Sequence, residues 1–154
     1  MLRFINYSVV FQEIPSEVTL AINLTNCPNR CKGCHSPHLW EDRGETLDNN
    51  LLDALLDKYG KAITCVCFMG GDASPKEVEQ CSIFLHNRTE GRIKVGWYSG
   101  KESFPQECSV QNFDYIKLGA YIEHLGGLNS ATTNQRLWRI DNGTMVDMTK
   151  AFLK

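Results

Sequence analysis

Two kinds of hydrophobic pattern alternate along the chain. Runs of apolar, largely β-branched residues are typical of buried strands, and apolar residues at helical spacing are typical of amphipathic helices. The first pattern predicts strands over residues 18–25, 63–69, 93–99 and 113–118, with a fifth extended segment near 136–140. The second pattern fills the intervals after the first and the second of these strands.

Two helices are expected in those intervals. The first begins after Thr46 as its N-terminal cap and ends before Gly60. In the second, Ser74 and Glu77 form a capping box and Pro75 occupies the first helical position. The apolar faces consist of Leu47, Leu51, Leu55 and Tyr59 in the first helix and of Val78, Cys81, Phe84 and Leu85 in the second.

The alternation of strands and helices predicts an α/β protein. Such an order produces right-handed βαβ units and a mostly parallel sheet. Ligands of such sheets bind at the carboxyl ends of the strands. We therefore expect three segments to converge on one site: the residues after the first strand, Gly70-Gly71-Asp72 after the second, and Ser99-Gly100 after the third.

Composition and charge narrow the class of protein. The 154 residues are 42% hydrophobic and 22% charged, and no linker or repeat divides them, so we expect one globular domain over 1–154. The formal net charge of -2 provides no basic field for nucleic acid. No apolar run approaches the roughly 20 residues of a membrane helix, and no secretion signal is recognisable, so we expect a cytoplasmic protein.

Three of the seven cysteines fall within eight residues of the segment NCPNRCKGCH, residues 26–35. Cys27, Cys31 and Cys34 have the spacing Cys-x3-Cys-x2-Cys. In a reducing compartment, clustered cysteines hold metal or perform chemistry more often than they form disulfides. Eight residues span at most about 28 Å when extended and far less in a loop, so all three sulfurs can face one inorganic centre.

Two kinds of centre are compatible with three thiols. A structural zinc ion takes four protein ligands, and His35 or His38 would have to supply the fourth because no second cysteine pair follows. A 4Fe-4S cluster normally takes four thiolates, so three leave one iron available to a substrate or cofactor. The cluster explains why a fourth cysteine is missing, and zinc stays the second interpretation.

The four other cysteines require no such chemistry. Cys65 and Cys67 share one face of a predicted strand and are interpreted as small core residues. Cys81 belongs to the apolar face of the second helix, and Cys108 is interpreted as an ordinary loop thiol.

Four motifs in order give the chain a resemblance to the radical S-adenosylmethionine (SAM) enzymes. Cys31-Lys-Gly-Cys34, followed by Trp40, resembles the signature of the activating proteins of anaerobic ribonucleotide reductase. Met69-Gly-Gly-Asp72 is similar to the glycine-rich motif for the SAM amino group, and residues 97–100, WYSG, are similar to an aromatic-Thr-Gly motif. Residues 132–136, TTNQR, resemble a terminal Ser-Ser-Asn-Gln segment.

The resemblance implies a fold, two cofactors and the residues that hold them. The fold would be a small partial, open βα barrel of the radical SAM type. Cys27, Cys31 and Cys34 would hold one 4Fe-4S cluster per chain, and its open iron would bind SAM. No catalytic side chain is expected beyond these ligands, and Asp72 either accepts from the SAM ammonium or orients the turn. The residues implied in SAM binding are Gly33, Cys34, His35, Gly70, Gly71, Asp72, Ser99, Gly100 and Asn134.

The implied activity is reductive cleavage of SAM, which yields a deoxyadenosyl radical that takes a hydrogen atom from a glycine of a partner. The partner would be the large subunit of anaerobic ribonucleoside-triphosphate reductase, with a flavodoxin-type protein as electron donor. Another glycyl-radical enzyme, such as a lyase, is the alternative partner, and a non-catalytic zinc-binding module is the alternative class. Relatives often have Pro-Gly where this chain has Pro15-Ser16. Several have an Asp-Gly-Lys-like turn where this chain has Leu118-Gly-Ala120, and Lys117 is a candidate to replace the positive charge of the lysine that is missing from that turn.

Overall fold

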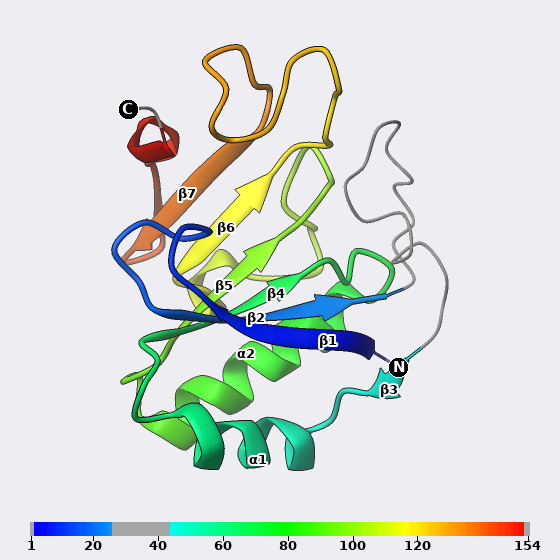
Figure 1. Ribbon diagram of the computed structural model, residues 1–154, viewed down its shortest axis with the longest axis vertical. Coiled ribbons are helices and arrows are strands. Elements are labelled where there is room, and N and C mark those ends of the chain that lie inside the picture. The colour runs from blue at the N-terminus through cyan, green and yellow to red at the C-terminus, as the bar shows by residue number, and fades with distance from the viewer. Residues whose placement is uncertain (1, 26–43, 153–154) are drawn as a thin grey trace.

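All β-strands that the computed structural model describes belong to one sheet. The structure describes residues 2–25 and 44–152, and the sheet has eight strands in the order β3-β1-β2-β4-β5-β6-β7-β8 (Figure 1). The strands are β1 (Arg3–Val10), β2 (Thr19–Leu24), β3 (Glu45–Thr46), β4 (Cys65–Met69), β5 (Lys94–Tyr98), β6 (Tyr115–Leu118), β7 (Arg136–Asp141) and β8 (Thr144–Asp147). The helices described are α1 (Asn49–Tyr59), α2 (Pro75–Thr89) and the 3-10 helices η2 (Val110–Asn112) and η3 (Thr149–Phe152).

The centre of the sheet is parallel and its two sides are antiparallel. β2, β4, β5 and β6 run parallel to one another, whereas β1 and β3 on one side and β7 and β8 on the other pair antiparallel. The prediction of a mostly parallel sheet is therefore wrong for the described sheet as a whole and correct for its four central strands. The parallel neighbours are joined by long crossovers, whereas residues 142–143 form a short hairpin that returns the chain antiparallel from β7 to β8.

Both predicted helices are present, but the capping residue of α1 and the capping bond of α2 differ from expectation. Asp48 caps α1, and its carboxylate accepts from the Leu51 N–H at 2.9 Å. Thr46 lies in β3 instead, where pairing with β1 takes it out of the cap position. α2 begins at Pro75 as predicted, but the Ser74 side chain makes no capping hydrogen bond, so the predicted capping box is wrong. No helix in the described part of the chain is long and apolar enough to cross a bilayer.

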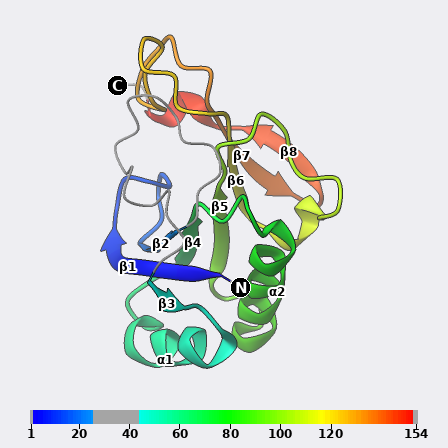
Figure 2. The same cartoon turned by 90° about the vertical axis from the view of Figure 1, so that its right-hand side faces the viewer.

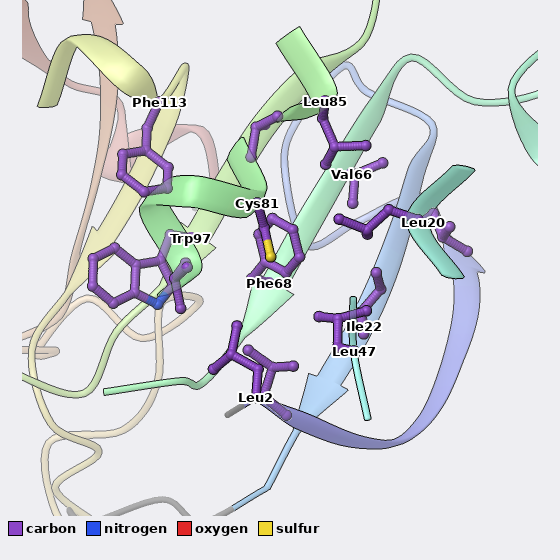
Figure 3. Close-up of a cluster of buried hydrophobic side chains, with 14 of the residues drawn as sticks. Leu2, Leu20, Ile22, Leu47, Val66, Phe68, Cys81, Leu85, Trp97 and Phe113 are labelled. Carbon is purple, nitrogen blue, oxygen red and sulfur yellow. The ribbon is translucent and has the colours of Figure 1, made fainter. Parts of the chain in front are cut away.

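Both α-helices lie on one face of the sheet, and the larger apolar core is buried between them and the strands (Figures 1 and 2). Alternate residues of the central strands point to this face, as the two-residue period of a strand requires. Figure 3 shows part of this core, which includes Leu20, Ile22, Val66, Phe68, Cys81 and Leu85.

The crossover from β5 to β6 contains no α-helix, and aromatic rings cover that part of the face. Phe104 and Phe113 pack on the buried Trp97, with ring centroids 5.9 Å and 5.5 Å from that of the indole. Edge-to-face and stacked pairs of this kind stabilise beyond the area they bury. The two phenylalanine rings therefore hold Trp97 firmly in place.

The segment between β1 and β2 covers the opposite face of the sheet. Ile14 is fully buried over Gly96, where a Cβ would lie 2.7 Å from the Ile14 Cδ1 atom. Gly96 therefore permits the close approach of this segment. The Tyr98 hydroxyl donates to the Glu13 carbonyl, and burial raises the pKa of that hydroxyl well above its usual value.

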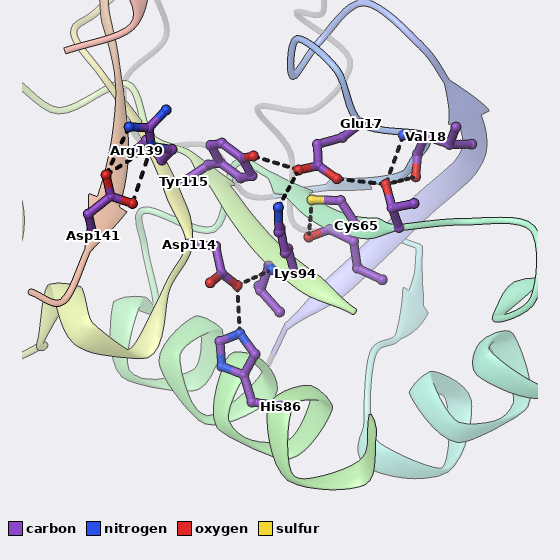
Figure 4. A network of polar contacts seen from close by, with 12 residues as sticks. Glu17, Val18, Cys65, His86, Lys94, Asp114, Tyr115, Arg139 and Asp141 are labelled. Atoms are coloured by element: carbon purple, nitrogen blue, oxygen red, sulfur yellow. Dashed lines mark hydrogen bonds and ion pairs between the residues drawn. The ribbon is translucent and has the colours of Figure 1, made fainter. Parts of the chain in front are cut away.

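Glu17 is the polar anchor of the same segment, and only 7% of it is exposed (Figure 4). Its carboxylate accepts from the Tyr115 hydroxyl at 2.5 Å, the Thr64 hydroxyl at 2.7 Å and the Lys94 ammonium at 3.0 Å. Burial by itself raises the pKa of Glu17, but these donors outweigh burial and hold the pKa below its usual value. The ionised form of Glu17 therefore stabilises the fold.

Replacing Glu17 with glutamine is expected to lower the free energy of unfolding at pH 7 by about 1–3 kcal/mol. A carboxylate whose pKa is lowered by folding contributes stability above its unfolded pKa of about 4.3, and the contribution is lost as the pH falls through the folded pKa. Urea unfolding should show a difference between wild type and Glu17→Gln at pH 7 that shrinks at acid pH.

The surface pair between Asp53 and Arg88, 2.7 Å apart and about half exposed, provides a control for this experiment. Asp53→Asn should cost at most about 1 kcal/mol, because water screens such pairs. A cost of Glu17→Gln that is as large at pH 3 as at pH 7 would show that the charge of Glu17 is not what stabilises the fold.

Candidate cofactor-binding site

The four parallel strands β2, β4, β5 and β6 end at one edge of the sheet. β7 begins at the same edge because it is antiparallel to β6, with Arg136 opposite Leu118. This edge therefore collects the residues after β2, β4, β5 and β6 and those before β7. The predicted site residues that follow β2 lie outside the described residues, namely Cys27, Cys31, Gly33, Cys34 and His35.

Two glycines let the chain turn sharply at the end of β4. Gly70 and Gly71 have φ angles of +107° and +90°, a region that residues with a side chain rarely adopt. A Cβ on Gly70 would lie 3.3 Å from the Leu24 carbonyl oxygen, and a Cβ on Gly71 would lie 2.6 Å from the Val78 Cγ2 atom. The turn thus packs against the last residue of β2, just before the chain enters the cysteine segment.

Asp72 ties this turn to the segment after β5. Its carboxylate accepts from the Ser99 hydroxyl at 2.6 Å and from the Gly100 N–H at 2.8 Å. Ser99 is fully buried, and its hydroxyl also accepts from the Lys101 N–H at 3.1 Å. The predicted convergence of the segments after β4 and β5 is confirmed, and these bonds support the orienting role of Asp72.

Lys117 places a buried positive charge at the same edge. Only 8% of the residue is exposed, and its ammonium donates to the Ser99 carbonyl at 2.9 Å and to the Gly119 carbonyl at 3.1 Å. Lys117 thereby joins the ends of β5 and β6. A lysine within the otherwise apolar strand YIKL must satisfy its ammonium when it is buried, and this is the signal that marks Lys117 in the sequence.

Asn134 lies at this edge too, held by the loop after β6. Its Nδ2 donates to the Ala120 carbonyl at 3.0 Å, whereas its Oδ1 is buried without a hydrogen-bond partner. Beside it, the Gln135 side-chain amide donates to the Gly119 carbonyl at 3.4 Å. The structure therefore brings Asn134 to the loop after β6, which Lys117 in turn connects to β5.

Of the four thiols in the described part of the chain, those of Cys65, Cys67 and Cys81 belong to the core, whereas Cys108 is partly exposed. Cys65 and Cys67 are fully buried on the face opposite the helices, as predicted, and burial raises the pKa of both thiols. Burial also raises the pKa of the Cys81 thiol to about 12. Thiolates rather than thiols bind metals, so these three are unsuited as ligands. His86 pairs with Asp114 at 2.7 Å (Figure 4). The described part of the chain holds no group of three His, Cys, Asp or Glu residues arranged to bind a metal ion.

Comparison with known families identifies the class of this molecule as an iron–sulfur protein. A family model described as a 4Fe-4S single cluster domain matches residues 18–111, more than half of the chain. The chain therefore belongs to this family and contains a 4Fe-4S cluster domain. The match spans the cysteine segment and the turns after β4 and β5, which favours the cluster over the zinc interpretation. Searches of curated proteins and of solved structures found no match.

Proposed function

We propose that the protein is a radical SAM activating enzyme that generates a glycyl radical on anaerobic ribonucleoside-triphosphate reductase. The observation that carries this proposal is the pair of hydrogen bonds by which Asp72 connects the turn at 70–72 to Ser99 and Gly100. These bonds lie at the edge of the sheet where β2 leads into the three-cysteine segment. A glycine turn at the edge where a strand leads into a cysteine-rich segment is suited to joint binding of a cluster and SAM. Membership of the 4Fe-4S single cluster family supports the proposed binding of a cluster.

Separate sets of residues would hold the two cofactors. Cys27, Cys31 and Cys34 are the proposed cluster ligands, and they leave one iron for SAM. The turn at 70–72 suits a ligand because it offers backbone groups, and its two glycines have no Cβ to block approach. The proposed SAM contacts are Gly33, Cys34 and His35 through their backbone, together with Gly70, Gly71, Asp72, Ser99, Gly100 and Asn134.

When bound, the cofactors would supply reductive cleavage of SAM and hydrogen-atom abstraction from the partner's glycine. The chain's own residues would position the ligand. Asp72 joins the ends of β4 and β5, and Lys117 joins the ends of β5 and β6, so three adjacent loops form one connected edge. Such fixed placement matters because reacting atoms must approach to about 3–3.5 Å. The ammonium of Lys117 also favours an anionic group at this edge, such as the SAM carboxylate.

The proposed fold is a partial, open βα barrel of the radical SAM type. The four parallel strands would form its wall, and the described sheet is open, with β3 and β8 at its two ends. An open wall leaves room for a polypeptide loop that carries the target glycine. The proposed partners are therefore the large reductase subunit and a reductive electron donor such as a flavodoxin-type protein.

A glycyl-radical signal tests this proposal. The full chain is reconstituted anaerobically with iron and sulfide, reduced, and incubated with SAM and the large subunit of a candidate reductase. We expect electron paramagnetic resonance to detect a radical on the reductase and none on a variant whose radical glycine is replaced by alanine. A radical that forms on a glycyl-radical lyase instead would change the partner. A chain that binds zinc and cleaves no SAM would refute the enzyme assignment.

A further inference from the structure

The indole of Trp97 holds the backbone of the glycine turn. Its Nε1 donates to the Gly70 carbonyl oxygen at 2.7 Å, and the Gly70 N–H donates to the Tyr98 carbonyl at 3.0 Å. Trp97 and Tyr98 are neighbours on β5, so one strand holds the backbone on both sides of Gly70. The direction of the Gly70 carbonyl is therefore set by β5.

Packing on the far side of the indole fixes this contact. Phe113 stacks on Trp97 with ring centroids 5.5 Å apart, and Figure 3 shows these two rings side by side. Phe104 meets the indole edge-on at 5.9 Å. A buried indole N–H that lost its acceptor would be left unsatisfied, which is costly, so packing and hydrogen bonding select the same orientation. Because Trp97 is fully buried, it acts on a ligand through Gly70 rather than by direct contact.

The Gly70 carbonyl keeps the capacity to bind a ligand. A carbonyl oxygen has two lone pairs, and Trp97 occupies one of them. At the other end of the turn, the Asp72 carboxylate is bound by Ser99 and Gly100. The turn is thus held at both ends before any ligand arrives, which is the arrangement expected of a preorganised site.

We propose that Trp97 is a positioning residue that aims the Gly70 carbonyl at the ammonium group of an amino-acid moiety. The inference rests on the proposed function, in which SAM supplies that ammonium. A carbonyl whose direction is already fixed binds a cation without a further entropy cost. The indole N–H therefore contributes to affinity for the amino-acid part of the ligand and leaves affinity for the adenosine part unchanged.

Two ligands that differ in this group provide the test on the full, reconstituted chain. SAM carries the ammonium, whereas 5′-methylthioadenosine shares the adenosine part and lacks the amino acid. Trp97→Phe keeps an aromatic ring and removes the N–H. Its dissociation constant for SAM, measured by equilibrium dialysis, is expected to rise roughly three- to tenfold. Its dissociation constant for methylthioadenosine should remain that of the wild type.

Phe104→Leu is the matched control, because it removes one of the rings that pack on Trp97 and keeps the indole N–H that donates to Gly70. It should keep the wild-type ratio of the two dissociation constants. Benzothienylalanine in place of Trp97 has the shape of tryptophan without the N–H, and it repeats the test if the phenylalanine variant folds poorly. A wild-type ratio in the variants at position 97 overturns the inference alone. Wild-type protein that does not bind SAM overturns the proposed function, and the inference with it.

Discussion

Replacing Cys31 with alanine is expected to abolish assembly of the 4Fe-4S cluster and, with it, cleavage of SAM. The proposed cluster has three protein ligands, so the loss of one leaves two irons without a thiolate. No other cysteine of residues 26–35 is left to replace it. Iron content and deoxyadenosine formation after anaerobic reconstitution should both fall to background. The same result is expected for Cys27 and Cys34.

Cys108→Ala is the matched control for the cysteine variants. Cys108 is a partly exposed free thiol outside residues 26–35, and its removal leaves the proposed ligands intact. Iron content and SAM cleavage should equal those of the wild type. SAM cleavage that survives in Cys31→Ala, or that disappears in Cys108→Ala, would contradict the ligand assignment.

Gly71→Ala is expected to destabilise the fold by about 2–5 kcal/mol and to disrupt the ligand site. Two costs add at this position. The φ angle of +90° strains any residue with a Cβ. The new Cβ would also lie 2.6 Å from Val78 Cγ2 and 2.9 Å from Leu24 Cδ1, and a valine in a helix has little rotamer freedom to move aside. Urea unfolding and SAM binding measure the two consequences.

Gly91→Ala separates strain from crowding. Gly91 also has a positive φ, of +77°, but nothing lies within 4 Å of the position of its Cβ. Its replacement should cost about 1–2 kcal/mol from backbone strain alone and leave SAM binding unchanged. Equal destabilisation by the two substitutions would mean that the packing of Gly71 between β2 and α2 is not as close as described.

The central strands and both helices could be predicted because burial leaves a strong local pattern. Four consecutive residues of β4, CVCF, are buried, and the start of α2 is marked by Pro75. β1, β3 and β8 were not predicted. All three lie toward the sides of the sheet and carry exposed positions, so their hydrophobic pattern is weak. Their antiparallel pairing made the sheet less parallel than the alternation of strands and helices indicated.

The edge that carries the candidate site could be predicted from the order of strands and helices, because parallel strands end at one edge of a sheet. The bonds that organise the site could not be predicted. Asp72 and Ser99 are 27 residues apart in sequence, as are Gly70 and Trp97. Hydrogen bonds between residues so far apart produce no pattern in the local sequence. The sequence around a buried tryptophan does not indicate which backbone carbonyl accepts from its N–H.

Electron paramagnetic resonance of the reduced cluster, with and without SAM, tests the central claim most directly. The claim is that one iron of the cluster has no protein ligand and binds SAM. The reconstituted wild type should give the signal of a reduced 4Fe-4S cluster, and that signal should change on addition of SAM and not on addition of methylthioadenosine. A cluster signal that saturating SAM leaves unchanged, or a zinc ion in place of the cluster, would contradict the claim.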